Sequence, residues 1–243
     1  MAHRDNRRLD SHLVTLTSPA SFAAEQYQGL RLTIERLGRN RTLQVIAVTS
    51  PAAGEGKTLT AINLAGALAR GSDDARVLLI DADLRRPAVA RQLALDDGSG
   101  GLAEVVGNAG ATLDGVTQRL KTHNLSVISA GTRNGAVHHI LRSPRLDQVL
   151  AEARRRYDFI VLDTPPLLPV FDSALLANSV DGVLMVVAAN QTPRKLLGEA
   201  LNLLDPAKVL GIVFNRDARP MFGYYDAYYK DYFPDVSRVA TEA

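Results

Sequence analysis

The chain has 243 residues, of which 46% are hydrophobic and 22% are charged. This composition excludes a disordered, collagen-like or coiled-coil protein and predicts a folded core, and the formal net charge of +2 is too small to indicate a nucleic-acid partner by itself. The absence of cysteine excludes disulfides, thiolate–zinc sites and cysteine nucleophiles, and the five histidines show no metal-binding spacing.

Apolar, strand-like runs alternate with helix-like stretches along most of the chain. We predict strands at Leu43–Thr49, Val77–Asp81, Leu125–Ser129, Phe159–Asp163, Gly182–Ala188 and Val209–Asn215. The predicted helices are Phe22–Leu37, Lys57–Arg70, Pro87–Leu95, Val137–Arg156, Ser173–Asn178 and Pro193–Leu204. Most of the strands are continuously apolar, as in strands that helices cover on both faces. The pattern predicts an α/β fold, a mostly parallel, doubly wound sheet with helices on both faces.

We expect one α/β domain, residues 40–215, between an N-terminal arm and a C-terminal tail. The arm, residues 1–39, carries the predicted amphipathic helix Phe22–Leu37. The tail, residues 216–243, shows no further core pattern, and we expect it to be flexible. The best candidate for a linker inside the domain is Asp96–Gly101 (DDGSGG).

The first predicted strand runs directly into a glycine-rich loop, Ser50–Thr58 (SPAAGEGKT), and then into a predicted helix. This arrangement, a P-loop, binds nucleoside triphosphates, because glycines let backbone N–H groups surround the phosphates and the helix N-terminus adds a positive end. Lys57 can reach the β- and γ-phosphates, and the Thr58 hydroxyl can coordinate Mg²⁺. The strict pattern has glycine where this chain has Pro51, so we expect a modified entry to the loop. The predicted ATP-binding residues here are Ala53, Gly54, Glu55, Gly56, Lys57, Thr58 and Leu59.

Three aspartates follow buried strands. The sequence VLLIDADLRRP places Asp81 and Asp83 at one strand end, and FIVLDTPP places Asp163 at another. Parallel sheets bind ligands at the carboxyl ends of their strands, and Mg²⁺ prefers oxygen ligands. One such aspartate could merely cap the next helix, whereas three beside a phosphate loop favour metal and phosphate chemistry. We predict a Mg²⁺ site for which Thr58, Asp81 and Asp163 are the candidate ligands.

Five of the seven tyrosines fall within nine residues near the C-terminus, YYDAYYKDY. The segment lacks a helical or strand period, and Pro220 and Gly223 favour irregular structure. At ~3.3 Å per residue an extended chain from Arg216 to Tyr228 spans about 40 Å, enough to reach an active site, its own or a neighbour's. We predict phosphoacceptors, with an aromatic patch docked on the body or a partner as the alternative. They are Tyr224, Tyr225, Tyr228, Tyr229 and Tyr232.

Together GEGKT, DADLRRP, VLDTPP and the terminal tyrosine cluster resemble the bacterial tyrosine kinases (BY-kinases) of the CpsD/CapB type, over the span from Phe22 to Tyr232. The resemblance implies a protein-tyrosine kinase that uses ATP and Mg²⁺ to autophosphorylate its tail and so regulates capsular or exopolysaccharide synthesis or export. It implies a Walker A loop ending in GKT, a Walker A′ motif with Asp81 and Asp83, and a Walker B aspartate, Asp163. By resemblance, Asp81 is the leading candidate to orient or deprotonate the tyrosine hydroxyl, and Asp83 and Asp163 would support the metal. The choice between Asp81 and Asp83 as the base stays open, and the candidate catalytic residues are Lys57, Asp81 and Asp83.

The resemblance also implies partners. The family's self-association helix carries Glu-x-x-Arg-x-x-Arg, and here Glu25 and Arg31 match but Gln28 replaces the middle arginine, so a homo-oligomer is expected with less support than the kinase activity. No apolar run approaches the ~18–20 residues that cross a bilayer, and no apolar stretch follows the basic N-terminus. We therefore expect a cytoplasmic chain that a membrane-embedded polysaccharide co-polymerase activates in trans and recruits to the inner face of the membrane. A tyrosine phosphatase would reverse the reaction.

Two other functions compete with this interpretation. A ParA/MinD-type ATPase, acting as an ATP-gated dimer, shares the fold and the strand-end aspartates, but it carries an additional lysine early in the loop, where this chain has Ala52 and Ala53. A catalytically weak adaptor would use its tyrosine tail only to bind a partner. Asn215 ends the last strand where related folds place an asparagine near the purine, and a simple strand-terminating turn explains it equally well.

Overall fold

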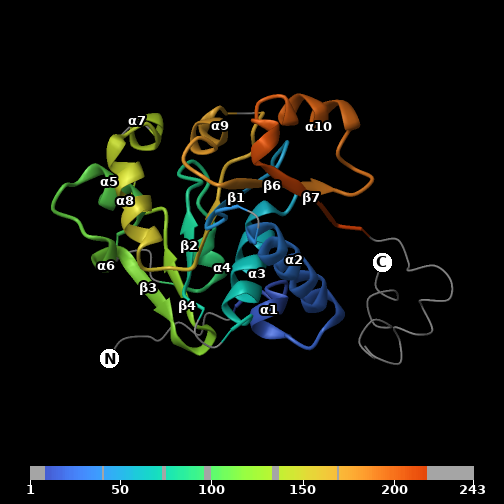
Figure 1. The fold of residues 1–243 in the computed structure, drawn as a ribbon, viewed down its shortest axis with the longest axis horizontal. Coiled ribbons are helices and arrows are strands. Elements are labelled where there is room, and N and C mark those ends of the chain that lie inside the picture. The colour runs from blue at the N-terminus through green and yellow to red at the C-terminus, as the bar shows by residue number, and fades with distance from the viewer. Residues whose placement is uncertain are drawn as a thin grey trace.

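A computed structural model describes residues 9–39, 41–72, 75–95, 100–132, 137–168 and 170–217, and the description below concerns these residues. They form a seven-stranded sheet in the order β3-β4-β2-β5-β1-β6-β7 (Figure 1). All neighbouring strands are parallel except β3 and β4, which are antiparallel. The strands are β1 Val45–Thr49, β2 Val77–Asp81, β3 Thr117–Leu120, β4 Leu125–Ile128, β5 Phe159–Asp163, β6 Gly182–Ala188 and β7 Val209–Asn215.

Helices cover both faces of this sheet. One face packs against α1 Val14–Thr17, α2 Phe22–Gly38, α3 Lys57–Ala69 and α4 Val89–Gln92. The other packs against α5 Leu102–Gly107, α6 Leu113–Val116, α7 Val137–Leu141, α8 Pro144–Arg154, α9 Asp172–Leu176 and α10 Arg194–Leu201. Two 3₁₀ turns, Lys121–His123 and Pro206–Lys208, precede β4 and β7. The predicted doubly wound, mostly parallel α/β fold is confirmed, because an apolar layer fills each side of strands that are themselves apolar on both faces.

The bounds of β2, β5, β6 and β7 agree with the prediction, β1 begins two residues later and β4 ends one residue earlier. The predicted helix Val137–Arg156 is wrong as a single element. Pro144 has no N–H to donate and begins α8, whose N-terminus is capped by the Ser143 hydroxyl, so the chain breaks between α7 and α8. The predicted helix Pro87–Leu95 shortens to α4, and strand β3 and helices α1, α5 and α6 were not predicted. Of the predicted linker, residues 96–99 lie outside the described part of the chain, and Gly101 is the N-cap of α5.

The N-terminal helices share the core of the sheet rather than standing apart from it. Leu13 and Ile34 are buried against the apolar side of α3 and the strands beneath it. The side chain of Asn63 on α3 fixes α1 in place: its Oδ1 accepts from the Thr15 backbone N–H at 3.0 Å and its Nδ2 donates to the carbonyl of His12 at 2.9 Å. The segment before the P-loop therefore rests on the P-loop helix itself.

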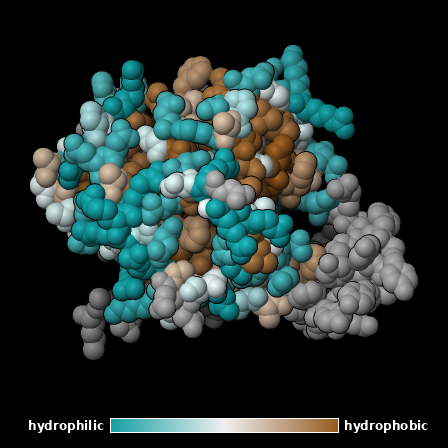
Figure 2. Space-filling model, viewed as in Figure 1, coloured by the Kyte–Doolittle hydropathy of each residue, from teal (hydrophilic) through white to brown (hydrophobic). Residues whose placement is uncertain are grey.

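Strand β7 forms one edge of the sheet and is only partly covered. Ile212 and Phe214 are exposed by 38% and 66%, in contrast to β6 beside it, which is buried throughout. Figure 2 shows hydrophobic residues gathered over the region where Figure 1 places β6 and β7, on a face that is otherwise largely hydrophilic.

The polar contact between α1 and α3 generates a prediction about stability. Replacing Asn63 with alanine leaves the buried Thr15 backbone N–H without its acceptor, so the free energy of unfolding should fall by about 2 kcal/mol in urea denaturation. The matched change Asn202→Ala, at the exposed end of α10, should change it by less than about 0.5 kcal/mol. Equal stability of the two variants would contradict the role given to Asn63.

Candidate functional site

The predicted P-loop lies between the end of β1 and the start of α3. Gly54 and Gly56 adopt positive φ angles of 84° and 91°, which glycine adopts without strain. At Gly56 a side chain is also excluded sterically, because a Cβ would lie 1.9 Å from Nδ2 of Asn215. The start of the loop, at Ser50 and Pro51, lies beside the segment that follows β5. There, Leu167 and Leu168 donate backbone N–H groups to the carbonyls of Ser50 and Pro51. Proline fits here because only its carbonyl is used.

Within the loop, the side chain of Glu55 is only 5% exposed, and its carboxylate holds the loop in shape. Its Oε1 accepts from the hydroxyl of Thr192 at 2.6 Å, and its Oε2 accepts from the backbone N–H of Ala52 at 3.2 Å. Asn215, at the end of β7, donates from Nδ2 to the backbone carbonyl of Glu55 at 2.9 Å. The ends of β6 and β7 thus fix the shape of the loop before any phosphate binds. Sequence reasoning missed Thr192, because no local pattern links it to Glu55.

The three predicted aspartates and Lys57 meet at the carboxyl edge of the sheet. Lys57 Nζ lies 2.9 Å from Oδ2 of Asp83 and 3.4 Å from Oδ1 of Asp163. The Thr58 hydroxyl donates to Oδ2 of Asp163 at 2.7 Å. Asp81 and Asp163 are paired neighbours on the adjacent strands β2 and β5. The side chain of Lys57 is only 12% exposed, so this group of charges is largely shielded from water.

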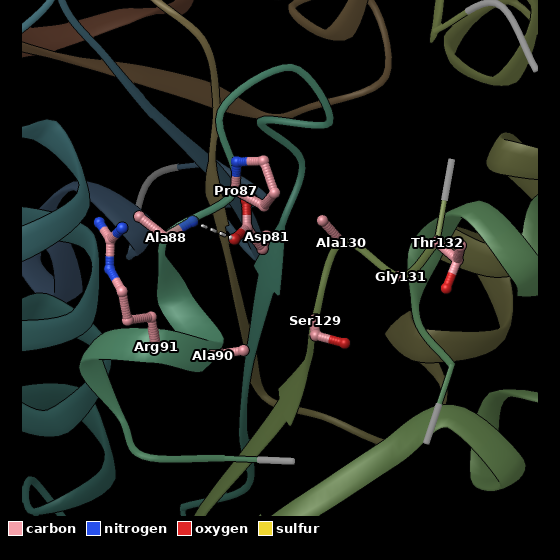
Figure 3. A pocket seen from close by; sticks show the side chains of 9 residues that line it. All are labelled: Asp81, Pro87, Ala88, Ala90, Arg91, Ser129, Ala130, Gly131 and Thr132. Carbon is pink, nitrogen blue, oxygen red and sulfur yellow. Dashed lines mark hydrogen bonds between the residues drawn. The ribbon is translucent and has the colours of Figure 1, made fainter. Parts of the chain in front are cut away.

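Asp81 is fully buried and is bound by backbone donors from the loop that follows it. Its Oδ1 accepts from the N–H of Asp83 at 3.1 Å, and its Oδ2 accepts from the N–H groups of Ala88 and Val89 at 3.0 Å each. Figure 3 shows the Ala88 contact beside a cavity of about 190 Å³ between the ends of β2 and β4. Its lining residues are Asp81, Pro87, Ala88, Ala90, Arg91, Ser129, Ala130, Gly131 and Thr132. Asp81 therefore shapes the loop and also adjoins an accessible cavity.

Burial and mutual repulsion perturb these groups. Burial, with the charge of Asp163 acting in the same direction, raises the pKa of Asp81 to about 7, although the backbone donors oppose the shift. Burial also raises the pKa of Asp163, although Lys57 opposes that shift. Burial alone would lower the pKa of Lys57, yet Asp163 and Asp83 outweigh it and the pKa is raised. One ammonium thus faces three carboxyl groups whose simultaneous ionisation is unfavourable, and a further cation would favour their charged forms.

The residues present fit a magnesium-bound triphosphate. Hydroxyl and carboxylate oxygens are the ligands that Mg²⁺ prefers, and the ion usually keeps several waters and phosphate oxygens. In the described ranges no three histidine, cysteine, aspartate or glutamate side chains group closely enough to hold a metal by themselves. Phosphate oxygens and water would therefore have to complete the coordination.

The other predicted residues fall in different places. On α2, Arg31 donates to Gln28 Oε1 at 2.9 Å and pairs with Glu35 at 2.7 Å, so its guanidinium is engaged within its own helix, while Glu25 is exposed. His138 and His139 are exposed on α7. The five tail tyrosines lie outside the described residues. Every described helix falls short of the length and hydropathy that crossing a bilayer requires.

Comparison with known proteins decides the family. The AAA domain model matches residues 43–205. The tyrosine-protein kinase YwqD of Bacillus subtilis (strain 168) is 32% identical over 93% of this chain and 96% of its own length. This chain belongs to the bacterial tyrosine-protein kinase family. The succinoglycan biosynthesis transport protein ExoP of Rhizobium meliloti (strain 1021) is 30% identical over 87% of this chain, which spans 27% of ExoP.

Solved structures agree with the assignment to the bacterial tyrosine-protein kinases. The kinase domain of the Escherichia coli tyrosine kinase ETK superposes with a TM-score of 0.78 at 27% identity, covering 87% of this chain and 84% of that one. The cell division ATPase MinD of Pyrococcus furiosus gives a TM-score of 0.61 at 23% identity, covering 82% of this chain and 87% of that one. The second likeness shows the shared P-loop fold alone.

The contact between Thr192 and Glu55 predicts a change in ATP affinity. Thr192→Val removes the hydroxyl that fixes the Glu55 carboxylate, so calorimetry should show about fivefold weaker ATP binding, the loss of one hydrogen bond. Thr192→Ser keeps the hydroxyl and should bind ATP as the unaltered chain does. Equal affinity in the valine and serine variants would contradict this role.

The raised pKa of Asp81 predicts a pH dependence of stability in the nucleotide-free protein. The folded state binds a proton that the unfolded state loses near pH 4, so the free energy of unfolding should fall as the pH rises from about 4 to about 7. Asp81→Asn should reduce this slope. Asp158→Asn should not, because Arg76 holds the pKa of Asp158 below its usual value and its effect lies at lower pH. An unchanged slope in Asp81→Asn would refute the assignment.

Proposed function

We propose that this chain is an ATP-dependent protein-tyrosine autokinase that transfers the γ-phosphoryl group of ATP to tyrosines of its own C-terminal tail. The observation that carries the proposal is the placement of Lys57, on the P-loop, against the strand-end carboxylates of Asp83 and Asp163. A positioned cation beside buried carboxylates suits phosphoryl transfer, in which positioning and charge stabilisation dominate.

Different residues of the chain would bind the phosphates and the Mg²⁺ ion. The backbone from Ala53 to Leu59 would surround the phosphates, and Lys57 would move from its carboxylate partners to the β- and γ-phosphate oxygens. Thr58, Asp163 and Asp81 are the residues that would hold Mg²⁺, which when bound offsets the charge between the β- and γ-phosphates.

In the reaction the tyrosine Oη forms a bond to the γ-phosphorus while the bond from that phosphorus to the β–γ bridging oxygen breaks, and ADP leaves. The phenol proton must go to a base. Asp81 is our candidate, because it is the strand-end carboxylate that adjoins an accessible cavity at the carboxyl edge of the sheet. Asp83, whose Oδ2 is engaged by Lys57, is the alternative.

The main rival, a ParA/MinD-type ATPase switch, has less support. That class carries an additional lysine early in the loop, whereas Ala52 and Ala53 stand there in this chain. The relatives that are kinases by name match more closely than MinD does. A tail with five tyrosines also gives the site an acceptor that an ATPase does not need.

We propose further that the reaction regulates capsular or exopolysaccharide synthesis or export. The name of ExoP, a succinoglycan biosynthesis transport protein, supports this setting. A membrane-embedded co-polymerase would activate the chain in trans at the inner face of the membrane, and a tyrosine phosphatase would reset it. Self-association stays part of the proposal, although Gln28 and Arg31 satisfy each other within α2. We assign the kinase domain to residues 40–215 and the acceptor tail to residues 216–243.

The central test uses labelled ATP and pure protein. Lys57→Met should lower tyrosine phosphorylation by about 100-fold or more, because the cation aimed at the transferring phosphate is lost. Lys121→Met removes the same charge from an exposed side chain just before β4, at the edge of the sheet opposite the P-loop, and should leave the rate unchanged. Changing the five tail tyrosines to phenylalanine should abolish labelling of the protein.

Other outcomes separate the rivals. Release of free phosphate without labelled tyrosine would favour the ATPase. Neither product, from a chain that binds ATP, would favour the adaptor. Label that persists in Lys57→Met would contradict the role of this lysine.

A further inference from the structure

A second cavity, of about 350 Å³, lies between the loop after β2, the end of α7 and the start of α9. Figure 1 places these two helices on the same side of the molecule, next to the loop after β2. Arg85 comes from that loop, His138 from α7 and Leu175 from α9. Arg142 directly follows α7, and Phe171 is the N-cap of α9. The cavity thus joins three elements that the catalytic strands position.

The groove is fixed relative to the catalytic edge. Arg85 lies two residues after Asp83, the partner of Lys57, in the loop after β2. Asp172 begins α9 in the segment after β5, and β5, which ends at Asp163, is the neighbour of β2 in the sheet. Arg85 Nε donates to Oδ2 of Asp172 at 2.6 Å, and Asp172 is only 3% exposed. This ion pair ties α9 to the loop after β2, so the groove includes the loop that carries Asp83.

The surface of the groove is cationic and aromatic. His138 on α7 and Arg142 directly after it are both exposed, and the backbone N–H of Arg142 donates to the carbonyl of His138 at 3.1 Å. No described acidic side chain pairs with Arg142. Phe171 is exposed by 72%, which makes it the most exposed large hydrophobic residue in the described part of the chain. A guanidinium pairs with carboxylates and stacks on aromatic rings, and a phenyl ring packs against other rings.

The tail has the complementary chemistry. Between residues 224 and 235 it carries five tyrosines and three aspartates, Asp226, Asp231 and Asp235, against one basic residue, Lys230. From this match we propose that the groove between α7 and α9 docks the acidic, tyrosine-rich segment of the tail. The inference rests on the proposed function and adds to it a rule for substrates: tyrosines with aspartate close by are preferred because Arg142 binds the aspartate and Phe171 a neighbouring ring.

A charge-reversal cycle in the full chain tests the docking. Arg142→Glu should lower the initial rate of tail phosphorylation about fivefold, the effect of losing an exposed charge pair and gaining a repulsion. Asp226→Lys with Asp231→Lys should lower it similarly, and combining all three changes should restore much of the loss. Arg155→Glu is the matched control, because Arg155 is exposed at the end of α8, before β5 begins and hence at the opposite edge of the sheet. It should have no effect, and ATP affinity should be unchanged in every variant.

A binding measurement separates this inference from the proposed function. A fluorescent peptide of residues 223–235 is titrated, without nucleotide, into the full chain carrying Asp226→Asn and Asp231→Asn, whose uncharged positions let its own tail compete only weakly. Adding Arg142→Glu should weaken peptide binding about fivefold, and adding Arg155→Glu should not. Equal affinity in the two variants would overturn the docking groove even if the tail is phosphorylated. Arg142-dependent binding in a chain that never labels tyrosine would support the groove and refute the kinase.

Discussion

The structure depends on one electrostatic constraint, a single lysine ammonium held among buried carboxylates. Lys57 lies 2.9 Å from Asp83 and 3.4 Å from Asp163, in surroundings where burial raises the pKa of both Asp81 and Asp163. Buried charges are costly unless they are paired, and here one lysine faces three carboxyl groups that it cannot all pair with. The site is therefore prepared for a ligand that brings its own cation and offers the lysine a new anionic partner, which is what a magnesium-bound triphosphate does.

The fold brings these charges together through the order of the strands. In the sequence, the P-loop, Asp81 and Asp163 belong to three separate segments, but β1, β5 and β2 are consecutive neighbours in the sheet. Because the three strands are parallel, their carboxyl ends meet at one edge, and the pairing of Asp81 with Asp163 sets the two carboxylates side by side. The more distant strands contribute through Thr192 and Asn215, which hold the P-loop from β6 and β7.

Most strands and the phosphate loop could be predicted from the sequence, because each depends on residues that are close together in the chain. Continuous apolar runs predicted the bounds of four strands. A predicted strand followed by a glycine-rich segment, a lysine and a predicted helix indicated the phosphate loop. The break between α7 and α8 had a signal, Ser143 followed by Pro144, that a helical period concealed. Strand β3 (TQRL) had none, since its half-exposed residues become a strand only by pairing with β4. Contacts across the fold were also out of reach: Glu55 and Thr192 are 137 residues apart, and so the carboxylate at the base of the P-loop could not be assigned its partner.

The dependence of ATP binding on magnesium tests the account most directly. Without a divalent cation the triphosphate brings its negative charge to an edge that already holds more carboxylates than Lys57 can neutralise. Calorimetry of ATP binding to the unaltered chain, with Mg²⁺ and with a chelator in its place, should therefore show at least about tenfold tighter binding with the metal. Equal affinity under the two conditions would contradict the claim that the buried carboxylates and the lysine together form a site for the metal-bound nucleotide.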